Sequence, residues 1–171
     1  MAHFAEVDIN NKVLRVLVAC SQDITNNGGD YSDQAATHFE TVVSFSPTGV
    51  KWLQTSINTE GGVHLLGGTP HRKNFAGKDG NYDPAADAFY APQPYGSWVL
   101  NTETYRWDPP TPKPSEDDKA VNWDENGQKW TGVNRTLEAN GTHLTFDWNP
   151  NTNSWDSSGS LTPETDQTLD Q

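Results

Sequence analysis

Histidines are the first candidates for chemistry in this 171-residue chain, because imidazole binds metals and transfers protons near neutral pH. A metal site needs ligands at close and defined spacing, such as two histidines one turn apart on a helix. No such pair occurs, and a Gly-Gly-Thr-Pro segment separates His64 from His71. We therefore expect no metal site, and solvated or structural roles for His3, His38, His64, His71 and His143.

Other catalytic motifs are missing from the sequence as well. No serine lies in a GxSxG turn, and the glycine pairs lack the Gly-Lys-Ser/Thr ending that binds phosphate. The acidic runs at 8–11 and 116–118 lack the calcium loop with its final Glu. Asp124 and Glu125 are adjacent on a predicted tight turn, so they point apart and do not form a glycosidase pair. We expect a protein without enzyme activity, catalytic residues or cofactor.

Cysteine usage also limits the chemistry. Cys20 is the only cysteine, so neither an internal disulfide nor a thiolate metal site can form within this chain. It ends the apolar run 13–20, and we expect a buried small hydrophobic side chain there.

The charge balance is strongly acidic, with 11 Lys and Arg against 23 Asp and Glu and a net charge of −12. A protein that binds nucleic acid through its net charge must be positively charged, because it has to attract phosphates, so no nucleic-acid partner is expected. No apolar stretch is long enough to span a membrane, and residues 1–12 do not resemble a secretory signal. We expect no membrane partner and synthesis in the cytoplasm without a signal peptide.

One concentrated basic spot stands out in this acidic chain, at residues 72–78. It could dock an acidic neighbour, including the acidic tail of a second copy, and the alternative is an ordinary solvated loop. The candidate docking residues are Arg72, Lys73 and Phe75.

The N-terminal part predicts a hairpin, one helix and short strands. Residues 3–19 alternate around a turn at 9–11, which is typical of a β-hairpin. Residues 21–34 are polar and Gly-rich, and we expect a surface loop that ends where Ser32 caps the helix. Short strands are expected at 50–57 and 63–66. The helix would place four apolar side chains on one stripe: Ala35, Phe39, Val42 and Val43.

A repeated pattern follows from residue 80 onward. Each unit has a large apolar residue, then Asp or Asn, then five mostly polar residues and an aromatic residue. The Asp or Asn can accept a hydrogen bond from the backbone two residues on, with a left-handed residue after the turn, as at Gly127. The apolar ends then pair across two strands, so each unit is predicted to be a hairpin. Residues 7–14 fit the same frame with aliphatic ends. The expected repeat core is Tyr82, Phe89, Leu100, Trp107, Trp123, Trp130, Trp148 and Trp155.

The seven tryptophans leave two interpretations open. Only 33% of the residues are hydrophobic, so these indoles can be the core of a protein with few aliphatic side chains. Alternatively, tryptophans exposed on one face can stack on sugar rings, as in a glycan-binding module.

The fold class predicted from these patterns is mostly β, with short antiparallel hairpins in a meander or sandwich and one short helix. Proline-rich connectors are expected at 91–95 and 108–115. The expected organisation is a β-rich region with the helix at 1–79, tryptophan-rich hairpin repeats at 80–157 and a flexible acidic tail at 158–171.

Four segments of this chain resemble a family of small virion-associated proteins of tailed bacteriophages, especially phages of marine bacteria and cyanobacteria. These segments are AHFAEVDINNKVLRVLVA at 2–19, WLQTSINT with GGVH at 52–64, RKNFAG at 72–77 leading to Tyr82-Asp83, and DAFYAPQPYGSWVL at 87–100. The resemblance spans residues 2 to about 132; the Gly/Asn-rich loop at 21–34 and the extension at 133–171 depart from the family.

The resemblance implies a structural part of a virion with no catalytic residue. We expect a surface accessory protein, either a head decoration or a tail-associated part, whose partners are capsid or tail proteins and copies of itself. The alternative function is a glycan-binding module of a tail fibre, used in host attachment.

Overall fold

The structure, a computed structural model, describes residues 2–43, 50–115 and 118–162. It is mostly β with short antiparallel sheets, as the sequence predicts. Two compact units divide the chain: the first contains residues 1–94 and 100–107, and the second contains residues 95–99 and 108–171. The boundary therefore lies later than the predicted one after residue 79, because the hairpin at 81–90 packs into the core of the first unit.

The first unit is built on a three-stranded antiparallel sheet in the order β2-β1-β3. The predicted hairpin is present as β1 (Ala2–Val7) and β2 (Val13–Ala19), and β3 (Lys51–Thr55) pairs with the other side of β1. Side chains alternate between the two faces of a strand, so Phe4 and Ala5 point to opposite sides of this sheet. Both are fully buried, which shows that both faces of β1 are covered.

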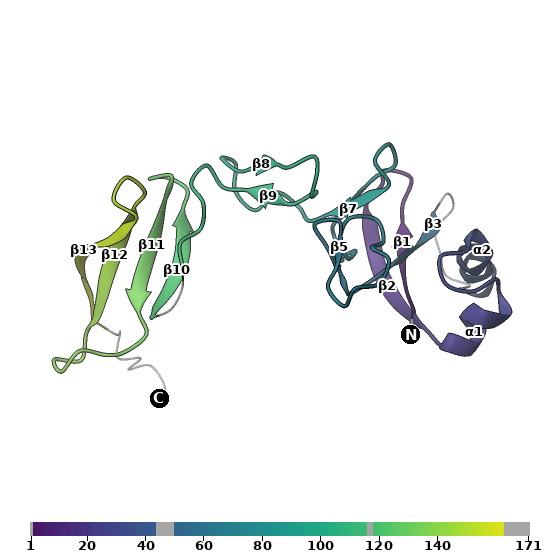
Figure 1. Ribbon diagram of the computed structural model, residues 1–171, viewed down its shortest axis with the longest axis horizontal. Coiled ribbons are helices and arrows are strands. Elements are labelled where there is room, and N and C mark those ends of the chain that lie inside the picture. Colours follow the sequence, from purple (N-terminus) through teal and green to yellow (C-terminus); the bar gives the residue numbers. More distant parts are fainter. Residues whose placement is uncertain (1, 44–49, 116–117, 163–171) are drawn as a thin grey trace, which may run out of the picture. The chain divides into compact units, whose positions relative to one another are not determined.

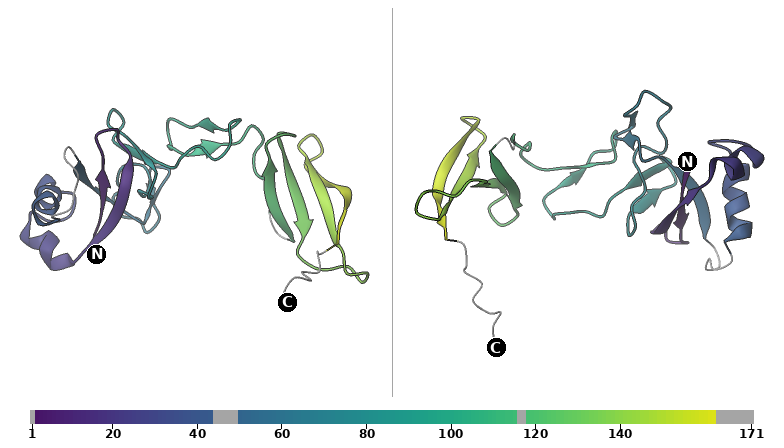
Figure 2. Two further views of the ribbon diagram at one scale, coloured as in Figure 1. Left: turned by 180° about the vertical axis from the view of Figure 1, so that it is seen from behind. Right: turned by 90° about the horizontal axis from the view of Figure 1, so that it is seen from below.

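Two helices, α1 (Ser21–Asn26) and α2 (Asp33–Val42), lie together on one side of this sheet (Figure 1, Figure 2). The ring of Phe39 on α2 stacks on Phe4 at 4.4 Å between centroids and lies 5.7 Å from Trp52. The predicted helix cap is present, since the Ser32 hydroxyl accepts from the backbone N–H of Ala35 at 3.1 Å. The predicted stripe is wrong at Val42, which is 53% exposed.

Helix α1 corrects two predictions. Residues 21–26 were expected in a loop, but the helix forms because Ile24 is buried in the core with Phe4 and Phe39. The Cys20 sulfur caps this helix by accepting from the backbone N–H of Asp23, and Cys20 is exposed rather than buried. Ile24 is the only apolar side chain of α1, so the sequence carries no helical periodicity there.

The opposite face of the sheet is covered by the hairpin of β6 (Asn81–Asp83) and β7 (Ala88–Tyr90). Tyr82 and Phe89 pack with Ala5, Val7 and Val13 in a second core cluster. Phe89 is 1% exposed, and burying a side chain of this size stabilises a fold by about 1.5–3 kcal/mol. Two further short hairpins are present, with β4 (Thr59–Glu60) paired to β5 (Val63–His64) and β8 (Val99–Leu100) paired to β9 (Trp107–Asp108).

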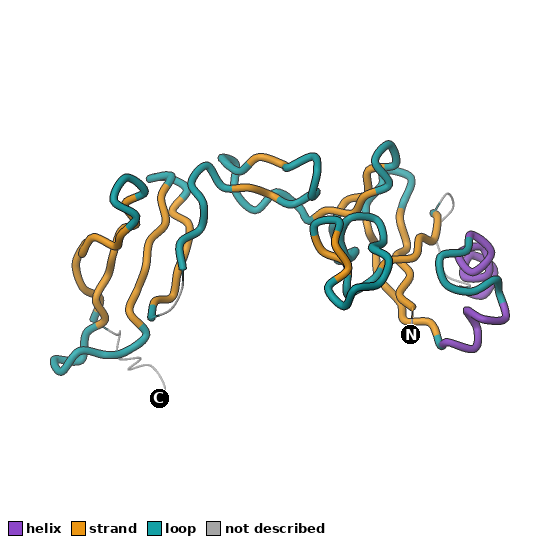
Figure 3. Tube along the Cα trace, in the orientation of Figure 1, coloured by secondary structure: helices purple, strands orange, loops and turns teal. Residues whose placement is uncertain are grey.

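The second unit contains a four-stranded antiparallel meander, in which successive strands are neighbours (Figure 3). Its strands are β10 (Lys119–Asp124), β11 (Lys129–Asn134), β12 (His143–Asn149) and β13 (Ser154–Leu161). Strand β13 includes residues 158–161, which were predicted to begin a flexible tail. Residues 163–171 of that predicted tail lie outside the described residues.

The repeated pattern corresponds to hairpins whose apolar ends meet across two strands. Tyr82 pairs with Phe89, Trp123 with Trp130 and Trp148 with Trp155. The ring centroids in these three pairs are 5.2, 5.1 and 5.2 Å apart. The strand pairing differs in the N-terminal unit at residues 7–14, because a β-bulge pairs Val7 with Val13 instead of Leu14.

The Asp or Asn of each unit makes the predicted turn hydrogen bond, its Oδ1 accepting from the backbone N–H two residues on. The five such acceptors are Asp8, Asp83, Asn101, Asp124 and Asn149. In the four C-terminal units the left-handed residue is the fourth after the Asp or Asn, so Gln128, with φ 47°, occupies this conformation instead of the predicted Gly127. The other three are Asp87, Tyr105 and Asn153.

Candidate binding surfaces

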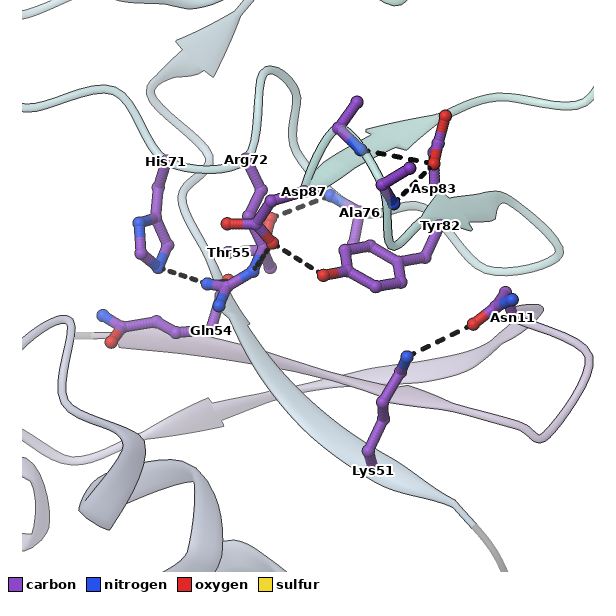
Figure 4. A network of polar contacts seen from close by, with 12 residues as sticks. Asn11, Lys51, Gln54, Thr55, His71, Arg72, Ala76, Tyr82, Asp83 and Asp87 are labelled. Atoms are coloured by element: carbon purple, nitrogen blue, oxygen red, sulfur yellow. Dashed lines mark hydrogen bonds and ion pairs between the residues drawn. The ribbon is translucent and has the colours of Figure 1, made fainter.

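The basic spot predicted for docking is centred on Arg72, whose guanidinium is used inside the first unit (Figure 4). Its Nη1 donates to the backbone carbonyl of Gln54 at 2.8 Å and lies 2.6 Å from Nε2 of His71. Its Nε forms an ion pair with Oδ1 of Asp87 at 2.9 Å. These contacts tie β3 to the turn between β6 and β7, so Arg72 is a structural residue and not a free docking cation.

The same network changes the protonation of two neighbours. Burial, followed by the positive charge of Arg72, lowers the pKa of His71 to about 4, so this imidazole is neutral near pH 7. The Tyr82 hydroxyl donates to Oδ1 of Asp87 at 2.7 Å. Burial and this hydrogen bond raise the pKa of Tyr82 to about 12. Both groups therefore stay uncharged beside the Arg72–Asp87 ion pair.

The other two candidate docking residues are half-buried. The backbone carbonyl of Lys73 accepts from Gly62 at 2.7 Å. The ring of Phe75 meets His3 edge-on at 5.4 Å, and its backbone N–H donates to Thr59 at 3.0 Å. The segment at 72–75 is thus held by the fold, because Arg72 and Phe75 direct their side chains into internal contacts.

The eight residues of the predicted repeat core fall into two groups. Tyr82, Phe89, Trp123 and Trp130 are buried, with exposed fractions of 9%, 1%, 6% and 4%. The core assignment is wrong for the other four, which are only half-buried: Leu100, Trp107, Trp148 and Trp155.

The buried tryptophan pair of the second unit is covered by segments that precede it in the chain. The ring of Trp98 lies 6.2 Å from Trp123 and 5.9 Å from Trp130. The indole N–H of Trp130 donates to the carbonyl of Thr111 at 2.8 Å, so the proline-rich connector packs on this hairpin.

Glu125 fixes the covering segment to the sheet. Its carboxylate accepts from the backbone N–H and the hydroxyl of Ser97 at 2.8 and 2.7 Å, and from the indole of Trp123 at 2.8 Å. The hydrogen bonds from Ser97 and Trp123 lower the pKa of Glu125. This carboxylate therefore joins Ser97 to the β10–β11 hairpin.

The second tryptophan pair, Trp148 and Trp155, lines an open groove of about 540 Å³. The connector residues 111–115 form one side of this groove, and the ends of β12 and β13 with their turn form the other. The lining residues are Thr111, Pro112, Lys113, Pro114, Ser115, Trp148, Pro150, Asn153, Ser154 and Trp155. Sequence reasoning grouped Trp148 and Trp155 with the core because their spacing matches that of the buried pair.

Within residues 2–43, 50–115 and 118–162, no three His, Cys, Asp or Glu side chains come close enough together to hold a metal ion. In the same part of the chain, no helix has the length and apolar character needed to cross a membrane. Comparisons with protein-family models, curated proteins and solved structures found no match for this chain.

Proposed function

We propose that this protein is a non-enzymatic structural component of a bacteriophage virion, an accessory protein that docks on a repeating head or tail lattice. The resemblance of residues 2–132 to small virion-associated phage proteins supports this proposal. The proposed partners are capsid or tail proteins, together with further copies of the chain itself.

The observation that carries the docking proposal is the edge strand β13. It pairs with β12 on one side and ends the sheet order β10-β11-β12-β13. All of its residues except Trp155 are exposed. An unpaired strand edge offers a row of backbone donors and acceptors to which a strand of another chain can add. Strand addition at β13 would join this sheet to that of a virion protein.

Mass spectrometry of purified particles tests the proposal, with the copy number of this protein normalised to the major capsid protein. Hundreds of copies per particle would place it on a head or tail-tube lattice, and a few to tens would place it at a tail tip, fibre or neck. Absence from the particles would overturn the proposal.

Edge-strand variants test the docking mode separately. A lysine on an edge strand opposes pairing with another strand, so Ser158→Lys and Ser160→Lys should reduce the copy number on particles. Asn151→Lys adds the same charge in the exposed turn before β13 and serves as the control. Equal incorporation of all three variants would contradict docking through β13.

A further inference from the structure

We propose that the groove between residues 111–115 and the Trp148–Trp155 pair binds a neutral oligosaccharide. This inference rests on the groove itself and does not depend on the virion proposal. Its volume of about 540 Å³ lies within the usual range of about 300–1,000 Å³ for small-ligand sites.

The apolar part of the groove consists of rigid rings. Three prolines, Pro112, Pro114 and Pro150, line it together with the two indoles. The indoles of Trp148 and Trp155 meet edge-to-face, with centroids 5.2 Å apart and planes 65° apart. Flat apolar surfaces of this kind match the C–H faces of pyranose rings.

The position of Trp155 is fixed from below by Gly132. A Cβ added to Gly132 would come within 3.1 Å of the Trp155 ring, so the indole lies directly over this glycine. The ammonium of Lys119 lies 5.9 Å from the centroid of the same ring. The Trp155 indole is therefore already placed before any ligand arrives, which lowers the entropic cost of binding.

The polar lining of the groove favours a neutral ligand rich in hydroxyls. Thr111, Ser115, Asn153 and Ser154 carry hydroxyl or amide groups that both donate and accept hydrogen bonds. Sugar hydroxyls do the same, whereas a proline-rich peptide has carbonyl acceptors and few donors.

The charge of the groove points the same way. Residues 86–171 contain 14 acidic and 5 basic residues, yet among the residues that the structure describes no acidic side chain lines the groove, and Lys113 is the one charged residue in that lining. Among these described lining residues a cationic ligand would lack a carboxylate partner, and a polyanion such as nucleic acid would find a single cation.

The test is a titration of the full chain with neutral trisaccharides, among them maltotriose, cellotriose and triacetylchitotriose, followed by NMR of the indole N–H groups. We expect at least one of them to shift the signals of Trp148 and Trp155. The signal of Trp52, which is 1% exposed in the first unit, should not move. A titration with a polyproline peptide runs in parallel.

Variants then assign the site. Trp148→Ala and Thr111→Val should each weaken saccharide binding by at least tenfold, and Thr111→Val keeps the side-chain volume and the carbonyl that holds Trp130. Thr131→Val is the matched control, because Thr131 lies on β11 between Trp130 and Gly132 and so points to the opposite face of the sheet.

Three outcomes overturn the proposal. They are no shift with any of the trisaccharides, shifts with the polyproline peptide alone, and equal loss of binding in Thr111→Val and Thr131→Val. None of these results bears on whether the protein is present in phage particles.

Discussion

The ring of Trp155 on β13 lies over Gly132 on β11, two strands away in the same sheet. The stem of Lys119 on β10 also lies 3.2 Å from the Cβ position of Gly132. The absence of a side chain at residue 132 thus lets groups from both edge strands meet above the centre of the sheet.

Replacing Gly132 by valine should displace Trp155 and destabilise the second unit by about 1–3 kcal/mol, the usual cost of overpacking. Urea unfolding followed by tryptophan fluorescence measures this change. Gly77→Val is the control, because nothing lies within 4 Å of its Cβ position. Equal stability of Gly132→Val and the natural chain would contradict the close packing.

Two tryptophans in equivalent repeat positions should differ in their contribution to stability. Trp130 is 4% exposed, so Trp130→Ala should cost about 3–5 kcal/mol of unfolding free energy. Trp107 is half-buried and donates its indole N–H to the carbonyl of Ala91 at 2.9 Å. Trp107→Ala should therefore cost less than Trp130→Ala. Thermal melting of both variants measures the difference, and equal losses would show that burial does not distinguish them.

The turn carboxylates should be replaceable by Asn but not by Ala. Oδ1 of Asp124 accepts from the backbone N–H of Asn126 at 3.1 Å, and Asn149 makes the same bond in the next hairpin. Asp124→Asn should leave the melting temperature nearly unchanged, whereas Asp124→Ala should lower stability by about 1 kcal/mol. If both substitutions have the same effect, the turn hydrogen bond is not what stabilises this hairpin.

The stability of the first unit should fall as the pH drops below about 6.5, the ordinary pKa of histidine. The folded state holds the pKa of His71 at about 4, so between these values the unfolded chain binds more protons than the folded one. The contribution of neutral His71 is complete above pH 6.5 and is lost progressively as the pH falls toward 4.

Urea unfolding of the natural chain and of His71→Gln, at pH 7 and about pH 5, measures this effect. The stability advantage of the natural chain over the variant should shrink at the lower pH, because the variant has no proton to gain at this position. An advantage that does not change with pH would show that His71 does not titrate differently on unfolding.

Local chemistry made much of this fold predictable from sequence. The hairpin turns follow from Asp or Asn accepting a backbone hydrogen bond two residues on, and the cap of α2 follows from Ser32. Helix α1 was missed because its one apolar residue, Ile24, gives no periodicity. Its stability comes from contacts with distant residues of the sheet.

The candidate site was less predictable, because identical spacing has different outcomes at Trp123–Trp130 and Trp148–Trp155. The first pair is covered by Trp98 and the carbonyl of Thr111, and the second faces an open groove. In the same way, Arg72 appears in the sequence as part of a basic spot, but its contacts with Gln54 and Asp87, which lie elsewhere in the chain, make it structural.

The sequence by itself determined the hairpins, their aromatic pairs and their turn acceptors, because these depend on residues within one unit of the repeat. The tertiary structure decided which aromatic pairs are buried and which charges are internally paired. Both depend on contacts between segments far apart in the chain. A local sequence pattern does not indicate which of these segments covers which face of a sheet.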